Sequence, residues 1–165
     1  MQRIFILLMF FVLIIAGCKK TIENPTTTTV VNHDTTIVQG DHQIRFQLPS
    51  VGSDNNMYGL SDQQVNIQKF NIDYYTGVDS IFYSFYATNN DGSYGTVELY
   101  NFTDSLPIAG SLINVATNET IVYFQSGNLK ASFPHKEITV GLRVKGSKPA
   151  AFFSAIYSIL YLYRE

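Results

Sequence analysis

The chain has 165 residues, of which 11 are Lys or Arg and 13 are Asp or Glu, so its formal charge at pH 7 is −2. This mild charge gives no reason to expect a nucleic-acid partner. A single cysteine, Cys18, excludes an intramolecular disulfide, so an apolar core must stabilise the fold.

The N-terminus has the pattern of an export signal. A short basic start precedes residues 4–16, which are thirteen consecutive apolar residues. Thirteen residues are too few for the roughly 20 that a membrane-spanning helix needs. The small residues Ala16 and Gly17 end the run directly before Cys18, as at a signal cleavage site. An uncleaved signal anchor is the alternative interpretation.

The stretch Ile15-Ala16-Gly17-Cys18 resembles the lipobox of bacterial lipoproteins. The resemblance implies that the Cys18 sulfur receives a diacylglyceryl group and that cleavage before Cys18 removes the signal peptide, residues 1–17. Two or more acyl chains anchor a protein stably, whereas one chain does so only marginally. The resemblance therefore implies a membrane-lipid partner and a place in the bacterial cell envelope, at the outer membrane or cell surface in preference to the inner membrane.

Residues 18–40 are expected to form the lipidated N-terminus and a flexible linker. Threonine dominates this stretch, Pro25 interrupts it, and no helical period is present. As a flexible coil, residues 19–40 would span about 25 Å, and roughly 75 Å when fully extended. The alternative is that Val30-Val31 or residues 35–38 join the domain as an edge strand, because Thr and Val favour strands.

Residues 41–165 are expected to form one domain of short strands. Segments rich in β-branched and aromatic residues alternate with Gly, Asn, Asp, Ser and Pro, a pattern typical of strands and turns. The predicted strands are residues 42–48, 63–73, 80–88, 94–102, 111–116, 120–125, 129–133, 137–145 and 150–163. A change of alternation phase inside residues 63–73 predicts a β-bulge there.

The last segment, AAFFSAIYSILYLY, is long and apolar enough for a helix, but its alternation favours a strand. Aromatic and β-branched residues also fit a pleated surface better than a helix. Uninterrupted alternation would place Phe152 and Leu160 on one face, with Phe153 and Tyr161 on the other. Both faces are apolar enough for a central strand.

This succession of segments predicts an all-β fold, either an antiparallel β-sandwich or a barrel. From residue 78 on, the order of elements resembles the jelly-roll β-sandwiches of carbohydrate-binding modules and phage-associated accessory domains. The resemblance is carried by DSIFYSFYATNNDGSYGTVELYNFTDS, EITVGLRVKG and the aromatic final strand, and it covers about half of the chain. It implies a fold more than a ligand, because one sandwich hosts many functions.

No catalytic constellation is found, so we expect no enzyme activity, no cofactor and no metal. The sequence has no Gly-x-Ser-x-Gly elbow, His-Glu-x-x-His pair, Cys-x-x-Cys pair or phosphate-binding Gly-rich loop. The three histidines, His33, His42 and His135, are interpreted as solvated loop residues. Glu98 is the only acid within a strong strand, and it has no obvious partner. A calcium site is the alternative for three turn carboxylates, Asp79, Asp91 and Asp104.

Two groups of residues are candidates for a binding surface. Tyrosine offers an apolar ring face and a hydroxyl, which suits sugars and protein partners alike. The tyrosine candidates are Tyr83, Tyr86, Tyr94, Tyr100, Tyr157 and Tyr161. Arg143 and Lys145 share one strand face and form the second group, which could dock an acidic glycan or a membrane surface. A tyrosine-rich core and an ordinary solvated basic face are the alternatives.

Together these features predict a lipid-anchored envelope lipoprotein that displays a β-sandwich binding module, for carbohydrate or for adhesion. The alternative is a structural or accessory subunit of an envelope assembly, with no ligand of its own. The expected partners are membrane lipid, through acylated Cys18, and a glycan or an envelope protein.

Overall fold

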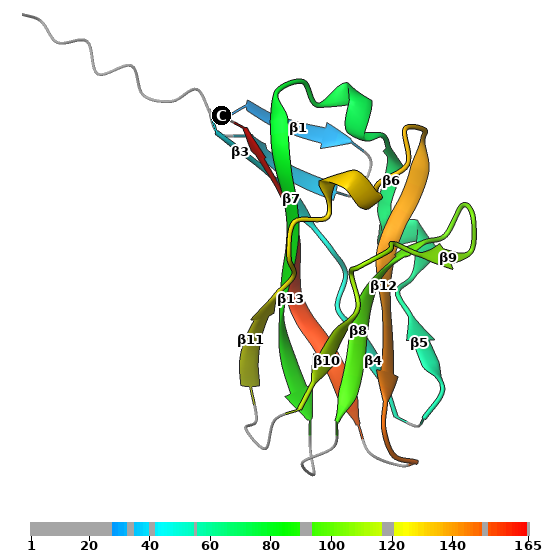
Figure 1. Cartoon of the computed structure of the whole chain (residues 1–165). Coiled ribbons are helices and arrows are strands. Elements are labelled where there is room, and N and C mark those ends of the chain that lie inside the picture. The colour runs from blue at the N-terminus through cyan, green and yellow to red at the C-terminus, as the bar shows by residue number, and fades with distance from the viewer. Residues whose placement is uncertain are drawn as a thin grey trace, which may run out of the picture.

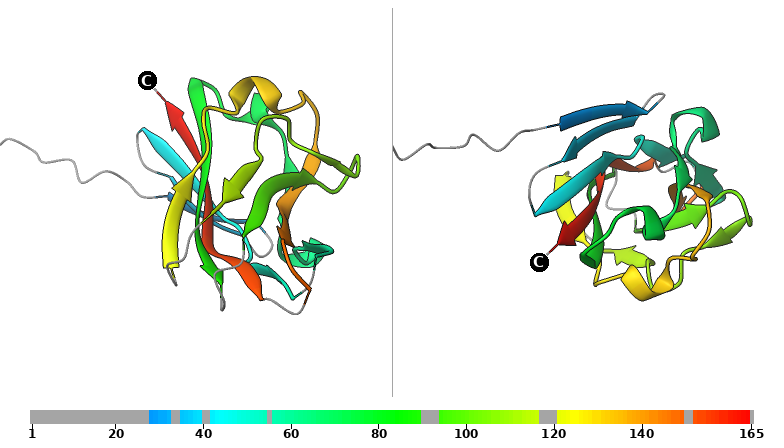
Figure 2. Two further views of the ribbon diagram at one scale, coloured as in Figure 1. Left: turned by 60° about the horizontal axis from the view of Figure 1, so that its bottom comes forward. Right: turned by 90° about the horizontal axis from the view of Figure 1, so that it is seen from above.

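The computed structural model describes residues 28–32, 35–39, 42–54, 56–89, 94–116, 121–149 and 152–164. These residues form two antiparallel β-sheets that pack face to face around one core (Figures 1 and 2). The predicted all-β antiparallel sandwich is therefore confirmed. The expected signal peptide (residues 1–17), Cys18, His33 and Asp91 lie outside the described residues.

The first sheet, sheet A, contains the long strands β7 and β13 at its centre, and its strand order is β1-β2-β3-β13-β7-β11 with β4 also paired to β13. Its strands are β1 (Thr28–Asn32), β2 (Thr35–Gln39), β3 (Gln43–Gln47), β4 (Val51–Ser53), β7 (Val78–Asn89), β11 (Ile121–Gln125) and β13 (Phe153–Arg164). Figure 1 shows β7 and β13 side by side along the length of the domain.

The second sheet, sheet B, is built around β8 and β12, and its strand order is β10-β8-β12-β5, with β6 paired to β12 and β9 paired to β8. Its strands are β5 (Tyr58–Leu60), β6 (Ile67–Phe70), β8 (Gly95–Asn101), β9 (Leu106–Pro107), β10 (Ile113–Val115) and β12 (Ile138–Gly146). The clean alternation predicted for residues 137–145 is present, because Ile138, Val140, Leu142 and Val144 all point into the core.

The core lies between the two inner sheet faces. It is filled by β-branched, Leu and aromatic side chains, since alternate residues of each central strand point inward. Tyr83 is completely buried in it, and its hydroxyl donates to the backbone carbonyls of Val97 (2.9 Å) and Ser111 (2.6 Å). This polar bridge joins β7 of sheet A to β8 and the segment before β10 in sheet B.

A β-bulge interrupts β13, and it overturns the uninterrupted alternation expected for the last segment. Ile156 pairs with Tyr86 and Ile159 pairs with Ser84, so Tyr157 and Ser158 together oppose one residue of β7. Tyr157 has a φ of 50° and its side chain is 69% exposed. The extra residue reverses the phase, so that Phe153 and Ala155 point inward before the bulge and Leu160 and Leu162 after it.

The sheet begins upstream of residue 41. β2 pairs with β3, for example Ile37 with Phe46, and β1 pairs with β2. Residues 28–32 and 35–39 are thus paired in sheet A, as in the alternative in which Val30-Val31 or residues 35–38 join the domain as a strand. Thr and Val at these positions fit an extended, paired backbone.

Two predicted strands differ from the structure. Residues 129–133 were expected to form a strand, but they contain the 3-10 helix η3 (Lys130–Ser132), started by Asn128 Oδ1, which accepts from the Lys130 N–H. Residues 63–73 hold only the short strand β6, between the 3-10 helices η1 (Gln63–Val65) and η2 (Ile72–Tyr74). The bulge predicted within this segment is present as a register shift against β12, with a φ of 50° at Lys69.

Candidate functional site

The fold divides the predicted binding residues among three environments. Tyr83 is 0% exposed, so its assignment to a binding surface is wrong: the inward phase of β7 buries it. Tyr86, Tyr157 and Tyr161 lie on the outer face of sheet A, whereas Tyr94, Tyr100, Arg143 and Lys145 belong to sheet B and its end. The sequence candidates therefore cannot form one surface, because the outer faces of a sandwich point in opposite directions.

Three tyrosines form a row across neighbouring strands on the outer face of sheet A, here called the tyrosine row. Tyr123 of β11 pairs directly with Tyr86 of β7, and Tyr157 of the β13 bulge lies beyond Tyr86. The Tyr86 ring centroid is 5.5 Å from that of Tyr123 and 6.3 Å from that of Tyr157. The three side chains are 39%, 48% and 69% exposed, in the order Tyr86, Tyr123, Tyr157.

On the described strands β7, β11 and β13, the outward positions next to the tyrosine row are uncharged. The neighbouring outward positions on the same three strands are Ile121, Gln125, Ser84, Thr88, Ser154, Ile156 and Ile159. Tyr161 lies further along β13, stacked on Tyr163 and covered by the Arg45 guanidinium 5.7 Å from its ring centroid. The row therefore offers apolar ring surface and amide and hydroxyl groups, a combination suited to uncharged, polyhydroxylated ligands.

The outer face of sheet B carries a different cluster, centred on Arg143. The Arg143 guanidinium carbon lies 4.2 Å from the ring centroid of Tyr58 and 4.7 Å from that of Tyr100. Arg143 Nε and Nη2 also contact the same carboxylate oxygen of Glu98, at 2.8 and 2.7 Å. Only 19% of the Arg143 side chain and 8% of the Glu98 side chain is exposed.

Glu98, expected to have no obvious partner, is thus paired across the strands with Arg143. This pairing neutralises the Glu98 carboxylate and holds the Arg143 side chain in place. Lys145 differs, because its ammonium lies 5.1 Å from the Tyr58 ring centroid and makes no ion pair within the described part of the chain. Of the two predicted basic residues, Lys145 is the one with charge to offer a ligand.

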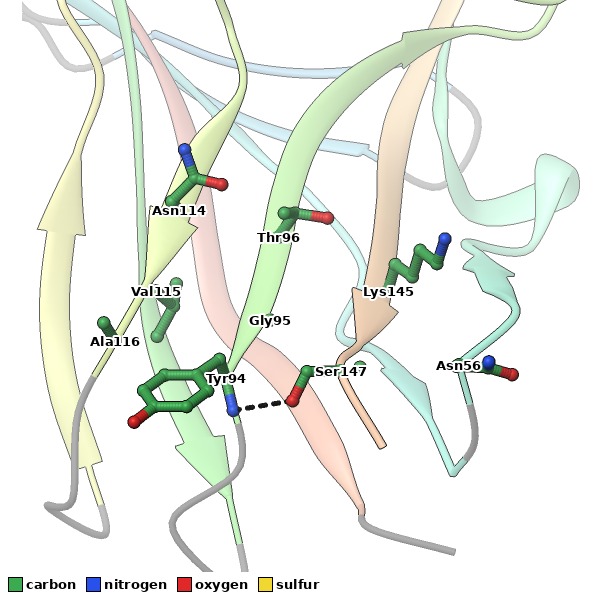
Figure 3. Close-up of a pocket in the computed structure, with 10 residues that line it drawn as sticks. Asn56, Tyr94, Gly95, Thr96, Asn114, Val115, Ala116, Lys145 and Ser147 are labelled. Atoms are coloured by element: carbon green, nitrogen blue, oxygen red, sulfur yellow. Dashed lines mark hydrogen bonds between the residues drawn. The ribbon is translucent and has the colours of Figure 1, made fainter. Parts of the chain in front are cut away.

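An open cleft of about 480 Å³ lies where β8 begins and β12 ends (Figure 3). Its polar lining comes from Asn56, Tyr94, Thr96, Asn114, Lys145 and Ser147. A reciprocal pair of hydrogen bonds holds its floor: Tyr94 N–H donates to Ser147 Oγ (3.0 Å), and Ser147 N–H donates to the Tyr94 carbonyl (2.9 Å). Two predicted residues, Tyr94 and Lys145, therefore meet in one concave site.

Two further ion pairs lie at the surface of the described residues. His135 Nδ1 lies 2.6 Å from Asp73, and both side chains are at least half exposed. Lys136 lies 2.8 Å from Asp104, and this hydrogen bond lowers the pKa of the Asp104 carboxyl. Within the described ranges no three His, Cys, Asp or Glu side chains are grouped to hold a metal ion, and no helix there is long and apolar enough to cross a membrane.

Sequence reasoning missed several residues of these sites, among them Asn56 and Ser147 of the cleft. Tyr123 lies in a correctly predicted strand, and the alternation of IVYFQ could have placed it outward with Tyr86. Tyr58 lies in a segment without a predicted strand, so no sequence signal placed it beside Arg143. Thr96 and Asn114 are ordinary outward strand positions, and only the pairing of β10 with β8 brings them together.

Comparisons with known proteins give structural matches only. No family model matches the chain, and no curated protein matches it. The carbohydrate-binding module CBM36, in complex with calcium and xylotriose, matches 80% of this chain and 97% of its own, with 11% identity and a TM-score of 0.40. The xylan-binding module CBM15 matches 86% of this chain and 92% of its own, with 7% identity and a TM-score of 0.40.

A protein of the disulfide-linked pili of Bacillus endospore appendages also matches, over 83% of this chain and 96% of its own, with 16% identity and a TM-score of 0.34. At these identities and TM-scores, the matches do not bear on what this chain binds.

Proposed function

We propose that the chain is a non-catalytic binding module whose tyrosine row holds a neutral polysaccharide. The observation that carries the proposal is the alignment of three exposed tyrosines on three adjacent strands, without a charged side chain among their outward neighbours. Sugar rings present C–H groups to aromatic faces and hydroxyls to amide and hydroxyl partners. The row supplies both, and its paired strands hold the rings in place before a ligand arrives.

The ring orientations favour a single glycan chain over a flat crystalline surface. The Tyr86 ring plane is turned by 63° from that of Tyr123 and by 87° from that of Tyr157. Three rings in different planes cannot all lie flat against one planar surface. Successive units of a twisted chain can instead meet them one after another.

The test is affinity electrophoresis of the full chain, in detergent, through gels that contain neutral soluble polysaccharides, followed by a glycan array. Tyr86→Ala and Tyr157→Ala are each expected to weaken the interaction about tenfold, which corresponds to about 1.4 kcal/mol per ring. Tyr74→Ala is the matched control, because Tyr74 is 60% exposed but lies on η2, away from the row. Equal retardation of all three variants and the unaltered chain contradicts the proposal.

We also propose that acylated Cys18 anchors the chain in the bacterial cell envelope, at the outer membrane or cell surface in preference to the inner membrane. The lipobox pattern supports this proposal. β1 begins at Thr28, so nine residues separate Cys18 from the first strand. Nine residues span at most about 30 Å. The sandwich would then lie within about 30 Å of the bilayer, whereas the longer linker expected from the sequence could extend to roughly 75 Å.

The anchor is tested by metabolic labelling with a fatty acid and by fractionation of cells that express the full chain. Cys18→Ser is expected to lose the label and to leave the membrane fraction, while Tyr74→Ala keeps both. Retention of label and membrane association by Cys18→Ser contradicts the anchor.

The alternative function, an accessory subunit of an envelope assembly, is favoured by one observation. β11 pairs only with β7 among the described strands, and it displays Ile121 (57% exposed) beside Tyr123. An apolar edge strand of this kind can add a strand from a partner. Crosslinking from intact cells tests it: a stoichiometric protein lost on Ile121→Lys, with glycan binding absent, supports the alternative.

A further inference from the structure

We propose that the cleft at the start of β8 and the end of β12 is a second binding site, specific for a carboxylate-bearing sugar such as a uronic acid. It lies on sheet B, whereas the tyrosine row lies on sheet A, so the two sites are independent.

The cleft is lined by one cross-strand row of outward side chains. Asn114 of β10 pairs with Thr96 of β8, Thr96 pairs with Lys145 of β12, and Lys145 pairs with Tyr58 of β5. Adjacent strands are about 4.8 Å apart, so the amide, the hydroxyl and the ammonium are spread over roughly 10 Å. Figure 3 shows Asn114, Thr96 and Lys145 on their three neighbouring strands along the cleft.

The described lining of the cleft carries a positive charge. Among the described residues that line it, Lys145 is the only charged one and none is a carboxylate. Two residues along the strand, Arg143 is already neutralised by Glu98, as its two short contacts show. Arg143 is therefore a structural cation, whereas Lys145 has no ion-pair partner within the described residues. An anionic group of a ligand can supply that partner.

The polar groups are held before a ligand arrives. Tyr58 lies against both the Arg143 guanidinium and the Lys145 ammonium, and so restricts the lysine side chain. The two hydrogen bonds between Tyr94 and Ser147 fix the ends of β8 and β12. Because Ser147 Oγ accepts from Tyr94, its own proton is available to a ligand oxygen.

These features select a sugar among anionic ligands. A half-exposed aromatic ring, Tyr94, borders a site that also offers two amides and two hydroxyls, from Asn56, Asn114, Thr96 and Ser147. Such groups match a ring with many hydroxyls, while one ammonium matches one carboxylate. Phosphate-rich ligands would call for several cations or a cluster of backbone N–H groups. The volume of about 480 Å³ is within the range of roughly 300–1,000 Å³ typical of small-ligand sites.

The experiment is a calorimetric titration of the full chain, in detergent, with oligogalacturonate and with oligoglucuronate. The fully methyl-esterified forms serve as ligand controls, because they keep the shape and lose the charge. We expect at least one acid to bind at least tenfold more tightly than its ester, and its affinity to fall as salt is raised. Lys145→Met is expected to remove this preference, and Lys145→Arg to retain it within about threefold.

Equal binding of acid and ester, absence of binding of both acids up to about 1 mM, or an unchanged preference in Lys145→Met overturns the proposal. Thermal unfolding of each variant shows whether it is folded, and Lys145→Arg provides a folded comparison that keeps the charge. Tyr86→Ala is expected to leave the acid titration unchanged while it weakens neutral-glycan binding. The proposal for the cleft and the proposal for the tyrosine row can therefore be contradicted independently.

Discussion

Arg143 donates from both Nε and Nη2 to one oxygen of Glu98, at 2.8 and 2.7 Å, between the rings of Tyr58 and Tyr100. Both charged side chains are largely removed from water, so each depends on the other for compensation. The pair fixes the register of β8 against β12 on the face that carries Lys145, and it leaves Lys145 as the available cation.

Arg143→Met is expected to lower the free energy of unfolding by about 3 kcal/mol, measured by urea denaturation. Methionine keeps apolar contact with the two tyrosine rings but leaves the Glu98 carboxylate without its cation. Adding Glu98→Gln to this variant removes the uncompensated charge and is expected to recover stability. A double variant no more stable than Arg143→Met contradicts this account.

Tyr83→Phe is expected to cost about 1–2 kcal/mol at neutral pH, because two buried carbonyls lose their shared hydroxyl donor. Burial, with a smaller contribution from the Glu98 charge, raises the pKa of Tyr83 far above the ordinary value of 10.0. Above about pH 10 the unfolded chain releases this proton and the folded chain retains it. The contribution of the Tyr83 hydroxyl to the free energy of unfolding is therefore fully present below pH 10, and it decreases as the pH rises above 10.

The measurement is the free energy of unfolding of the unaltered chain and of Tyr83→Phe between pH 8 and about pH 11.5. The difference between the two is expected to shrink above pH 10, by up to about 1.4 kcal/mol per pH unit. Phe85→Leu is the control, since Phe85 stacks on Tyr83 and does not titrate. If the destabilisation by Tyr83→Phe depends on pH no more than the destabilisation by Phe85→Leu does, a buried, protonated hydroxyl is ruled out.

At the bulge, Tyr157→Gly is expected to be more stable than Tyr157→Ala by about 1 kcal/mol. The φ of 50° at this position is costly for a residue with a Cβ and not for glycine. In an ordinary strand the order is reversed, so Gln125→Ala should be more stable than Gln125→Gly. Thermal unfolding of the four variants is the measurement. If Tyr157→Ala is more stable than Tyr157→Gly, the left-handed backbone conformation is not maintained at this position.

Gly95→Ala is expected to destabilise the domain by about 1–3 kcal/mol. A Cβ at this position would lie 2.5 Å from the Phe153 ring, where β8 of one sheet closely approaches β13 of the other. Gly127→Ala is the matched control, because nothing lies within 4 Å of its Cβ, and it should change stability by less than about 0.5 kcal/mol. Similar denaturation midpoints for both variants contradict the close approach of the sheets.

Several elements could be predicted because their causes are local. The strands at residues 80–88, 94–102 and 137–145 have period-2 alternation and turn residues at their ends, and all three are central strands in the structure. The expected strand at residues 129–133 failed for a local reason too, since the Asn128 side chain starts a 3-10 turn that alternation does not reveal.

The partners across strands could not be predicted in the same way. Glu98 and Arg143 are 45 positions apart in the chain, and they meet only because β8 and β12 pair in one register. The position of Tyr157 depends on the bulge in β13, which the uninterrupted apolar alternation conceals. Tyr86 could likewise be assigned to a strand from the sequence. Its place in the tyrosine row could not be predicted, because that depends on its pairing with Tyr123 and on the bulge in β13.

The sequence by itself determined the all-β class and the inward residues of β12, because alternation acts between near neighbours in the chain. It also determined the N-terminal signal pattern, which is a property of consecutive residues. Only the tertiary structure decided that the candidate tyrosines lie on two opposite faces, that Tyr83 is buried, and that Lys145 opens onto a cleft while Arg143 does not. These outcomes depend on strand order, register and one inserted residue, which are set by packing between segments distant in the chain.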